Sequence, residues 1–315
     1  MTAVVRGIAE WNRVATDIRC GEVVGLVPTM GALHNGHGAL FEEARQRCSV
    51  VVASIFVNPI QFNQRSDFDL YPRVFDDDVA FCEARGVDYI FAPPDDQMYP
   101  QPQRVFVDVE DLSADLCGRS RPGHFRGVAT VVMKLFQILQ PQLAFFGEKD
   151  YQQLAIVRRI VRDLNLSVQV VDVPTVRESD GLALSSRNRR LNPAERSLAP
   201  LLYRALVAAQ QLIALGERNA ASIKRRAIRV LQEIPEIRLD YFELVDPETI
   251  RPVNVVKAPV RVAGAIWIGE TRLIDNLYCE PGALSLEECS ISSSLPSNPS
   301  SGVELSIRTP DVNVW

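Results

Sequence analysis

An apolar run followed at once by a turn with two histidines constrains the fold most. The run is residues 23–27, Val-Val-Gly-Leu-Val, and Pro28, His34 and His37 follow it. A run without a polar face is typical of a strand buried in a parallel sheet. Pro28 is expected to end this strand, and a helical pattern follows from Gly38. The histidines are therefore expected at a helix entrance, where free backbone N–H groups and the helix dipole favour an anion.

The histidine pair is open to more than one interpretation. Zinc binding is disfavoured, because no third ligand follows at a metallohydrolase spacing and no glutamate lies between the two residues. Contact with phosphate is favoured, since the chain has three histidines and two of them lie at this turn. Histidines that only cap the helix or face solvent are the alternative.

Composition limits the classes of protein that this chain can represent. Its 315 residues leave room for about two domains, and 47% are hydrophobic and 23% charged, as in ordinary globular proteins. The net charge of −5 argues against a nucleic-acid partner. No apolar run approaches the roughly 20 residues that span a bilayer, and no secretory signal is apparent. We expect a cytoplasmic protein with no membrane partner. Six cysteines form no Cys-x-x-Cys pair, and Cys48 and Cys82 are expected in the core.

A second apolar run lies shortly after the histidine turn. Residues 50–57 predict another buried strand, and Asn58 and Gln61 follow it. Strand, helix and strand in this order form a right-handed βαβ unit, which places ligands at the carboxyl ends of its strands. Residues 28–37 and 58–61 are therefore expected side by side.

Hydrophobic periodicity predicts the other elements of a parallel sheet with helices. Strands are expected at residues 87–92, 143–146 and 168–173, with a further edge strand at 104–109. Helices are expected at residues 2–19, 76–85 and 128–139. A further helix is expected to begin within residues 147–153 and to end at about residue 164. Asp76, Asp77 and Asp78 open one of them, and helix capping is favoured over metal binding there.

Three polar segments carry further candidate residues. Residues 147–153 follow a strand and contain Lys149, which suits contact with phosphate. Residues 180–188 contain two serines and an arginine that can close over phosphates, although a plain linker has the same composition. A loop with Arg119, Arg121, His124 and Arg126 indicates either an anionic ligand or a solvated basic surface.

The pattern changes after residue 191. Helices are expected at residues 193–215 and 220–234, and strands at 238–245 and 258–268, which together indicate a smaller α+β domain. We therefore predict an α/β domain with a parallel sheet at residues 1–178, a smaller α+β lid domain at 179–282, and a disordered Ser- and Pro-rich tail at 283–315. Domain junctions are favoured ligand sites.

Seven sequence blocks resemble the signature set of the pantothenate synthetase family. They occur in the same order and cover about residues 1–280, at positions 28–37, 56–62, 71–73, 121–128, 147–153, 182–188 and 272–276. The resemblance implies a Rossmann-like nucleotidyltransferase domain with a small C-terminal domain, usually in a homodimer. It also implies an ATP-dependent condensation of pantoate with β-alanine through a pantoyl adenylate, with Mg²⁺ accompanying ATP.

The resemblance also assigns residues to roles. The catalytic residues that it implies are His34, His37, Lys149 and Arg187, with His37 as a proton donor. Gln61 and Gln153 are implied to hold pantoate, and the protein ligands of the metal stay unassigned. The implied ATP-binding residues are Pro28, Met30, Gly31, Ala32, Leu33, His34, Asn35, Gly36, His37, Gly147, Glu148, Lys149, Asp150, Val176, Leu184, Ser185, Ser186 and Arg187.

Elementary electrostatics agrees with these roles. A carboxylate that attacks a phosphate ester meets like charge, so Lys149, Arg187, the two histidines and Mg²⁺ are expected to neutralise the phosphates. Neutral amides at Gln61 and Gln153 can orient the carboxylate without a strong ion pair.

Two other functions compete with this one. An adenylyltransferase with a phosphorylated acceptor would favour arginine over glutamine in the acceptor pocket, and a non-catalytic ATP-binding protein would not need the histidine pair or Lys149. The chain has no Gly-x-x-x-x-Gly-Lys-Ser/Thr motif, so we expect no activity of the cytidylate kinase type that some relatives carry.

Overall fold

The structure is a computed structural model that describes residues 2–18 and 21–282. The tail predicted at 283–315 lies outside the described residues, as do Cys20 and Cys289. Cys48 and Cys82 are buried in the core, which confirms that expectation. Among the helices of the described part, none is both long and apolar enough to cross a membrane.

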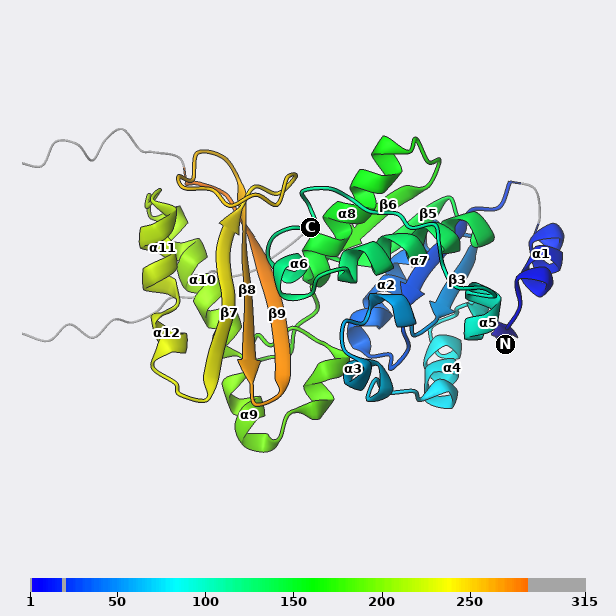
Figure 1. Ribbon diagram of the computed structural model, residues 1–315, viewed down its shortest axis with the longest axis horizontal. Coiled ribbons are helices and arrows are strands. Elements are labelled where there is room, and N and C mark those ends of the chain that lie inside the picture. Colours follow the sequence, from blue (N-terminus) through cyan, green and yellow to red (C-terminus); the bar gives the residue numbers. More distant parts are fainter. Residues whose placement is uncertain (1, 19–20, 283–315) are drawn as a thin grey trace, which may run out of the picture. The chain divides into compact units, whose positions relative to one another are not determined.

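A six-stranded parallel sheet forms the first half of the chain (Figure 1). Every pair of neighbouring strands in it is parallel, which confirms the predicted Rossmann-like α/β architecture. The strands lie in the order β1 (Ala3–Val5), β4 (Tyr89–Phe91), β3 (Val50–Ile55), β2 (Val24–Thr29), β5 (Leu143–Gly147) and β6 (Gln169–Val173).

Helices cover both faces of this sheet. Successive residues of a strand point to opposite faces, so Leu26 packs in a cluster with α7 (His124–Leu139), whereas Val27 packs in a cluster with α2 (Asn35–Arg47). The first face is also covered by α1 (Ile8–Asp17) and α8 (Tyr151–Asp163), and the second by α4 (Phe75–Glu83). Short helical turns connect the layers: η1 (Pro59–Gln61), α3 (Arg65–Asp69), α5 (Asp95–Met98), α6 (Cys117–Ser120), η2 (Glu148–Asp150) and η3 (Ser186–Arg190).

The strand order reverses between β2 and β5. The chain moves from β2 to β3 and β4 on one side, and then crosses back to β5 and β6 on the other side. Ligands of open α/β sheets bind in the crevice outside the carboxyl ends of the strands at such a reversal. The turns that follow β2 and β5 therefore flank the expected binding crevice.

A three-stranded antiparallel sheet forms the second half (Figure 1). Its strands are β7 (Ile237–Val245), β8 (Val260–Ile268) and β9 (Thr271–Cys279), and its helices are α9 (Pro193–Leu198), α10 (Leu201–Ala214), α11 (Ala220–Ala227) and α12 (Arg229–Gln232). Phe242 and Ile266 pack with the helices on one face. Tyr241 and Ala265 pack with Ile156 of α8 on the other face. This second contact joins the antiparallel sheet to the parallel one. The boundary at residue 178 stays a prediction.

Three local predictions were wrong, and one strand was missed. Residues 3–5 form β1 within the segment expected to be helical. Pro28 lies inside β2 and does not end it, because β5 pairs only with Gly25 and Leu26, so no ladder bond to β5 is needed at Pro28. Residues 104–109 form no strand in the described chain, since Val107 donates its backbone N–H to Thr130 Oγ1 of α7. Strand β9 was not predicted.

Candidate active site

A cavity of about 220 Å³ lies at the reversal point of the parallel sheet, and we call it the central cavity. The segments that follow β2, β3, β5 and β6 contribute to it, together with one side of α7. Of the residues predicted to bind substrate, the following line it: Pro28, Met30, His34, Gly36, His37, Gln61, Gly147, Lys149, Asp150, Gln153, Val176, Leu184, Ser185, Ser186 and Arg187.

Five predicted residues do not line the central cavity. Gly31, Ala32 and Leu33 are buried within the turn after β2. Asn35 is exposed and accepts a hydrogen bond from Arg85. The Glu148 carboxylate pairs with Arg261 of β8 at 3.2 Å. Their predicted contacts with ATP stay predictions.

The turn after β2 is held in place by Asp78 of α4. The Asp78 carboxylate accepts the backbone N–H groups of Ala32 at 2.9 Å and Leu33 at 2.7 Å. Gly31 and Ala32 both have positive φ angles, 77° and 52°. A Cβ atom on Gly31 would lie 2.7 Å from Asp78 Oδ2, so glycine is required there. Asp78 therefore tethers this turn instead of capping its own helix, and its oxygens are already engaged.

The two histidines begin α2 and bind backbone N–H groups through Nδ1. His34 Nδ1 accepts from Gly36 at 3.1 Å, and His37 Nδ1 accepts from the His34 backbone at 3.3 Å. Burial, with Lys149 and Arg189 nearby, lowers the pKa of His34 to about 4. Burial, with His34 nearby, lowers the pKa of His37 to about 3. Both rings are thus neutral near pH 7, with the proton on Nε2. Each ring can therefore donate a hydrogen bond from Nε2, and the predicted contact with phosphate stays a prediction.

Gln61 lies in η1, directly beside the turn after β2. Its amide oxygen accepts a hydrogen bond from Asn58 Nδ2 at 2.9 Å, and its Nε2 donates to Met30 Sδ at 3.0 Å. Tyr99 in turn donates to Asn58 Oδ1 at 2.7 Å. The expected proximity of residues 28–37 and 58–61 is confirmed. An amide nitrogen carries two hydrogens, so Gln61 can donate one more to a ligand.

His124 of the basic loop is hydrogen-bonded to the backbone of Gln61. With Nδ1 protonated, its ring donates to the Gln61 carbonyl at 2.8 Å, and Nε2 accepts from Arg121 at 3.0 Å. Burial and the Arg121 guanidinium lower the pKa of His124 to about 3, so this bridge is neutral. Arg119 and Arg126 are exposed. Only part of the predicted basic loop therefore faces the site.

The turn after β5 supplies a lysine, a carboxylate and two glutamines with different roles. Lys149 Nζ lies 3.7 Å from Asp150 Oδ2, and the Lys149 side chain is only 16% exposed. Gln152 is buried and joins three backbone groups, of Leu112, Asp115 and Cys117. Gln153 lines the central cavity. Gln152 therefore fixes the loop of residues 112–117, whereas the Gln153 side chain lies where it can contact a ligand.

The segment after β6 closes the central cavity. The Leu184 N–H donates to the Val176 carbonyl at 3.0 Å, so these two apolar residues lie together in the wall. Ser185 Oγ accepts the Arg187 N–H and begins η3. Arg187 lies 3.8 Å from Asp67. Its guanidinium therefore remains near the cavity without a close ion pair.

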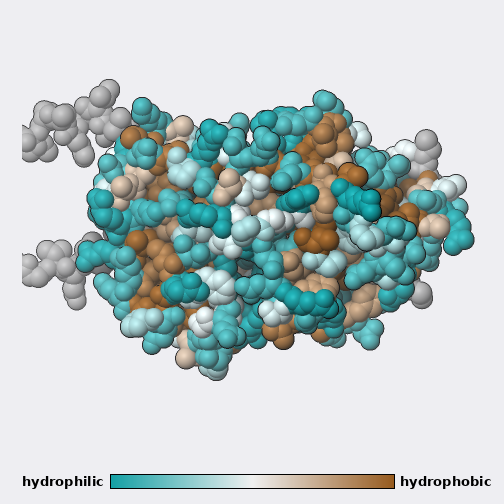
Figure 2. All heavy atoms as spheres, in the orientation of Figure 1, coloured by the Kyte–Doolittle hydropathy of each residue, from teal (hydrophilic) through white to brown (hydrophobic). Residues whose placement is uncertain are grey.

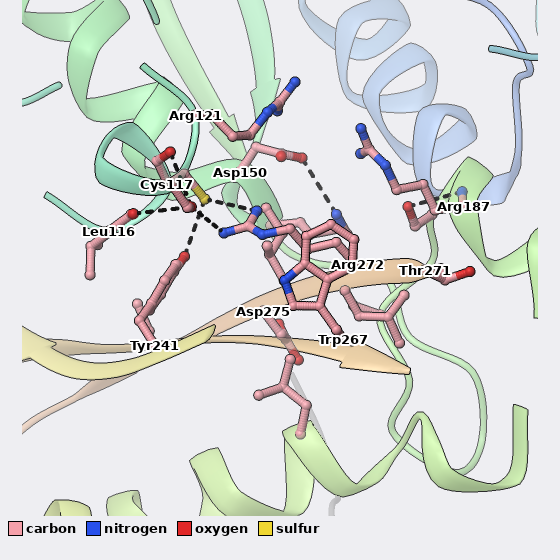
Figure 3. A pocket seen from close by; sticks show the side chains of 18 of the residues that line it. Leu116, Cys117, Arg121, Asp150, Arg187, Tyr241, Trp267, Thr271, Arg272 and Asp275 are labelled. Atoms are coloured by element: carbon pink, nitrogen blue, oxygen red, sulfur yellow. Dashed lines mark hydrogen bonds and ion pairs between the residues drawn. The ribbon is translucent and has the colours of Figure 1, made fainter. Parts of the chain in front are cut away.

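A larger cavity of about 1070 Å³ adjoins the central one and shares residues such as Lys149, Asp150 and Arg187 with it. We call it the outer cavity. Figure 3 shows Asp150 and Arg187 on one side of it, and Arg272 and Trp267 of the antiparallel sheet on the other side. The face of the molecule drawn in Figure 2 is largely hydrophilic, with scattered apolar groups. The outer cavity thus connects the central cavity with the antiparallel sheet.

Comparison with known proteins agrees with this geometry. Residues 3–278 match the model of a family described as pantoate-beta-alanine ligase. The chain is 48% identical over 274 residues to a pantothenate synthetase of Geobacter sulfurreducens, with 87% of this chain and 97% of that protein covered. It is 49% identical over 269 residues to a pantothenate synthetase of Moorella thermoacetica, with 85% and 95% covered.

Solved structures give the same result. The pantothenate synthetase of Thermus thermophilus superposes with a TM-score of 0.83 and 49% identity, over 88% of this chain and 99% of that one. The pantoate-beta-alanine ligase of Francisella tularensis, complexed with beta-gamma ATP and beta-alanine, has a TM-score of 0.75 and 32% identity, over 88% and 97%. The chain belongs to the pantoate-beta-alanine ligase family.

Membership of this ligase family confirms the predicted activity and fold. The chain is an ATP-dependent ligase that condenses pantoate with β-alanine to give pantothenate, AMP and pyrophosphate, with pantoyl adenylate as the intermediate. The competing function without catalysis is thereby rejected.

Sequence reasoning missed several residues of this ligase site. Tyr71 is buried in the cavity wall, where burial raises the pKa of its hydroxyl. Val131 and Val132 of α7 line the wall as well. Tyr71 lies in one of the family blocks, which was a usable signal. The α7 residues belong to a uniformly apolar helix, in which no local pattern separates cavity wall from core.

Proposed function

We propose that the central cavity binds the phosphates of ATP together with pantoate, and that its residues divide into neutral donors and cations. The observation that carries this proposal is that four separate segments meet at one cavity at the reversal point of the parallel sheet. His34 and His37 donate from Nε2 to phosphate oxygens, and Lys149 and Arg187 supply positive charge. Backbone and side-chain groups of residues 28–37, 147–150, 176 and 184–187 surround the nucleotide.

The first half-reaction joins two anions. The pantoate carboxylate attacks the α-phosphorus of ATP, the bond to the bridging oxygen breaks, and pyrophosphate leaves with the electron pair. Lys149 and Arg187 stabilise the charge that builds up on the leaving group. His37, whose Nε2 carries a proton at neutral pH, donates a hydrogen bond to the same group.

Neutral amides are suited to holding the attacking carboxylate. Gln61 has one free N–H and Gln153 lines the same cavity, so both can orient the carboxylate by hydrogen bonds. A cation at either position would form a strong ion pair and lower the nucleophilicity of the carboxylate. If Gln61→Glu left the KM for pantoate unchanged, this role for Gln61 would be wrong.

The second half-reaction needs the adenylate to be protected from water. The β-alanine amine attacks the acyl carbon, the acyl-phosphate bond breaks, and AMP leaves. The segment after β6 lies between the two sheets and covers the cavity with Val176 and Leu184. Exclusion of water by such a cover limits hydrolysis of the mixed anhydride.

Mg²⁺ fits this site as an ion carried mainly by the nucleotide. Among the residues that the structure describes, no group of three His, Cys, Asp or Glu side chains is arranged to hold a metal. Asp78 is engaged with two backbone N–H groups, and Asp150 is the carboxylate at the cavity. Asp150 with phosphate oxygens and water would hold the ion, which would neutralise phosphate charge.

The remaining assignments follow from the family. We propose that the chain acts in the cytoplasm as a homodimer, without nucleic-acid or membrane partners. Sedimentation at micromolar concentration tests the dimer.

One exchange assay tests the proposed reaction. Labelled pyrophosphate should enter ATP when pantoate is present and β-alanine is absent, because adenylation alone is reversible. An adenylyltransferase for a phosphorylated acceptor would show no exchange with pantoate. Absence of pantoate-dependent exchange in the wild-type chain would overturn the proposal.

A further inference from the structure

One sequence block, residues 272–276, has no role in the reaction described above. These residues, Arg-Leu-Ile-Asp-Asn, lie on β9 of the antiparallel sheet. Asp275 and Asn276 are each only 5% exposed, although both are polar. Buried polar side chains are costly unless hydrogen bonds satisfy them, so their partners indicate what they do.

The partners of Asn276 are the backbone carbonyls of the turn that carries the catalytic lysine. Asn276 Nδ2 donates to the carbonyl of Glu148 at 2.9 Å and to that of Lys149 at 3.0 Å. Its Oδ1 accepts from Arg261 at 2.9 Å, and the same Arg261 atom pairs with the Glu148 carboxylate. The antiparallel sheet therefore holds both the backbone and one side chain of η2.

Asp275 holds a second segment. Its two oxygens accept from Arg177 at 2.6 and 3.0 Å in a two-point pair, and the Asp275 side chain is 4% exposed. Arg177 also donates to the Gly181 carbonyl and forms a bridge with Ala183. The pair thus fixes the base of the hairpin that leads directly into Ser185 and Arg187. Figure 3 shows Asp275 on β9, below Asp150 and Arg187.

We propose that Asn276 and Asp275 are positioning residues that set the distance between Lys149 and Arg187. The two cations come from segments almost forty residues apart in the sequence, after β5 and after β6. Both segments are fastened to consecutive residues of one strand. A single rigid strand therefore determines where both positive charges lie relative to the phosphates, and this role rests on the function proposed for the central cavity.

Among the residues that the structure describes, the turn after β2 has no such hydrogen bond to β9, although Arg189 of η3 donates to the Leu33 carbonyl at 3.5 Å. Asp78, which tethers it, lies in α4 of the parallel-sheet half. Changes at β9 should therefore impair the step that needs the cations. Pantoate binding should stay near that of wild type, because Gln61 lies in η1 and Gln153 lies in α8, outside the fastened η2.

Asn276→Ala and Asn276→Asp test whether Asn276 positions Lys149. Asn276→Asp keeps the shape and the Arg261 partner but removes both N–H donors, so it remains informative if the alanine variant does not fold. In pyrophosphate exchange, both variants should lose about 10- to 100-fold in kcat, with the KM for pantoate within about twofold of wild type. Asn254→Ala, at an exposed amide between β7 and β8, is the matched control and should stay within about twofold.

A double-mutant cycle decides whether Asn276 acts through Lys149. In a Lys149→Met background, Asn276→Ala should cause no further loss beyond about twofold, because the group that it positions is gone. An undiminished loss in that background would overturn the proposal, as would a rise in the KM for pantoate that accounts for the whole defect.

Whether Asp275 positions Arg187 is tested in the same way. Asp275→Asn should lower kcat in the wild-type background and have little effect in Arg187→Ala. Arg177→Lys should restore part of what Arg177→Ala loses, since it keeps the charge but not the two-point geometry. Additive losses would contradict the role of Asp275.

Pyrophosphate exchange by the wild-type chain is the reference for all of these variants. If wild-type exchange is present and the double-mutant cycles are additive, only this inference fails. If wild-type exchange is absent, the proposed function and this inference fail together.

Discussion

The turns after β2 and β5 lie side by side at the central cavity but are built in opposite ways. The turn after β2 is tethered by Asp78 within its own half of the molecule and carries two neutral histidines. The turn after β5 carries Lys149 and is fastened by Asn276 from the antiparallel sheet. The comparison shows that the neutral donors are organised locally, whereas the positive charge is placed by a distant strand.

This difference has a physical basis. A neutral donor must be aimed at an acceptor but exerts little force over distance, so a local tether is sufficient. A cation acts over several ångströms and also repels other cations, so its location relative to Arg187 matters. Fastening both cation-bearing segments to one strand satisfies that requirement.

The largest expected effect separates charge from hydrogen bonding. Lys149→Met should lower kcat for pyrophosphate exchange by about two to three orders of magnitude, because it removes a cation at the developing charge. His37→Gln should cost only about tenfold, because a neutral donor is lost. Equal losses for the two variants would erase the contrast between the turns.

The neighbouring glutamines of the turn after β5 should behave differently. Gln153→Ala should raise the KM for pantoate by about 10- to 100-fold with little change in Tm, since the amide contacts the ligand. Gln152→Ala should lower Tm instead, because three buried hydrogen bonds to residues 112–117 are lost. Thermal unfolding together with steady-state kinetics measures both, and a reversal of the two phenotypes would refute the assignment.

Removing the local tether tests the turn after β2. Asp78→Ala should destabilise the chain by about 1.5–3 kcal/mol, because two buried N–H groups lose a charged acceptor. It should also raise the KM for ATP severalfold, as His34 and His37 lose their fixed backbone. Urea unfolding gives the first value and exchange kinetics the second. Asp77→Ala, at an exposed neighbouring carboxylate, is the control and should change neither.

The smallest expected effect on catalysis concerns pH. Burial lowers the pKa of His34 to about 4 and of His37 to about 3, so both stay neutral down to roughly pH 5. The kcat/KM of the free enzyme should therefore change less than about twofold between about pH 6 and 8 on their account. If kcat/KM instead fell below about pH 6.5 in the wild-type chain but not in His37→Gln, the His37 ring would be a cation in the free enzyme.

Folding stability should respond over a different pH range. The folded-state pKa values of His34, His37 and His124 lie below the unfolded value of 6.5, so the unfolded chain takes up protons first as the pH falls. Stability is therefore complete above about pH 6.5 and declines as the pH falls toward about 4, because the unfolded chain binds more protons over that range. His124→Gln should reduce that slope in urea unfolding.

Much of the fold was predictable because its signals are local. The buried strands at residues 50–55 and 143–147 have continuous apolar runs, and the turns after them carry the polar residues. The missed strands, β1 and β9, have weaker signals. Strand β1 has three residues and β9 mixes buried polar residues with apolar ones, so neither shows a clean period of two.

The candidate site was predictable in its membership but not in its chemistry. Residue types and family blocks identified the histidines, Lys149 and the glutamines. Their protonation states and partners depend on burial and on contacts between distant segments, such as that of Asn276 with Glu148, which lie 128 residues apart. Such contacts have no counterpart in local spacing.

The amino-acid order alone thus determined the parallel sheet, the positions of its functional turns and the family of the chain, because period, turn residues and motif blocks are properties of neighbouring residues. Only the tertiary structure decided that Asp78 holds a turn, that the histidines are neutral, that Gln152 and Gln153 differ, and that β9 fastens the two cation-bearing segments. Those properties arise from desolvation and long-range hydrogen bonds, which exist only once distant segments are packed together.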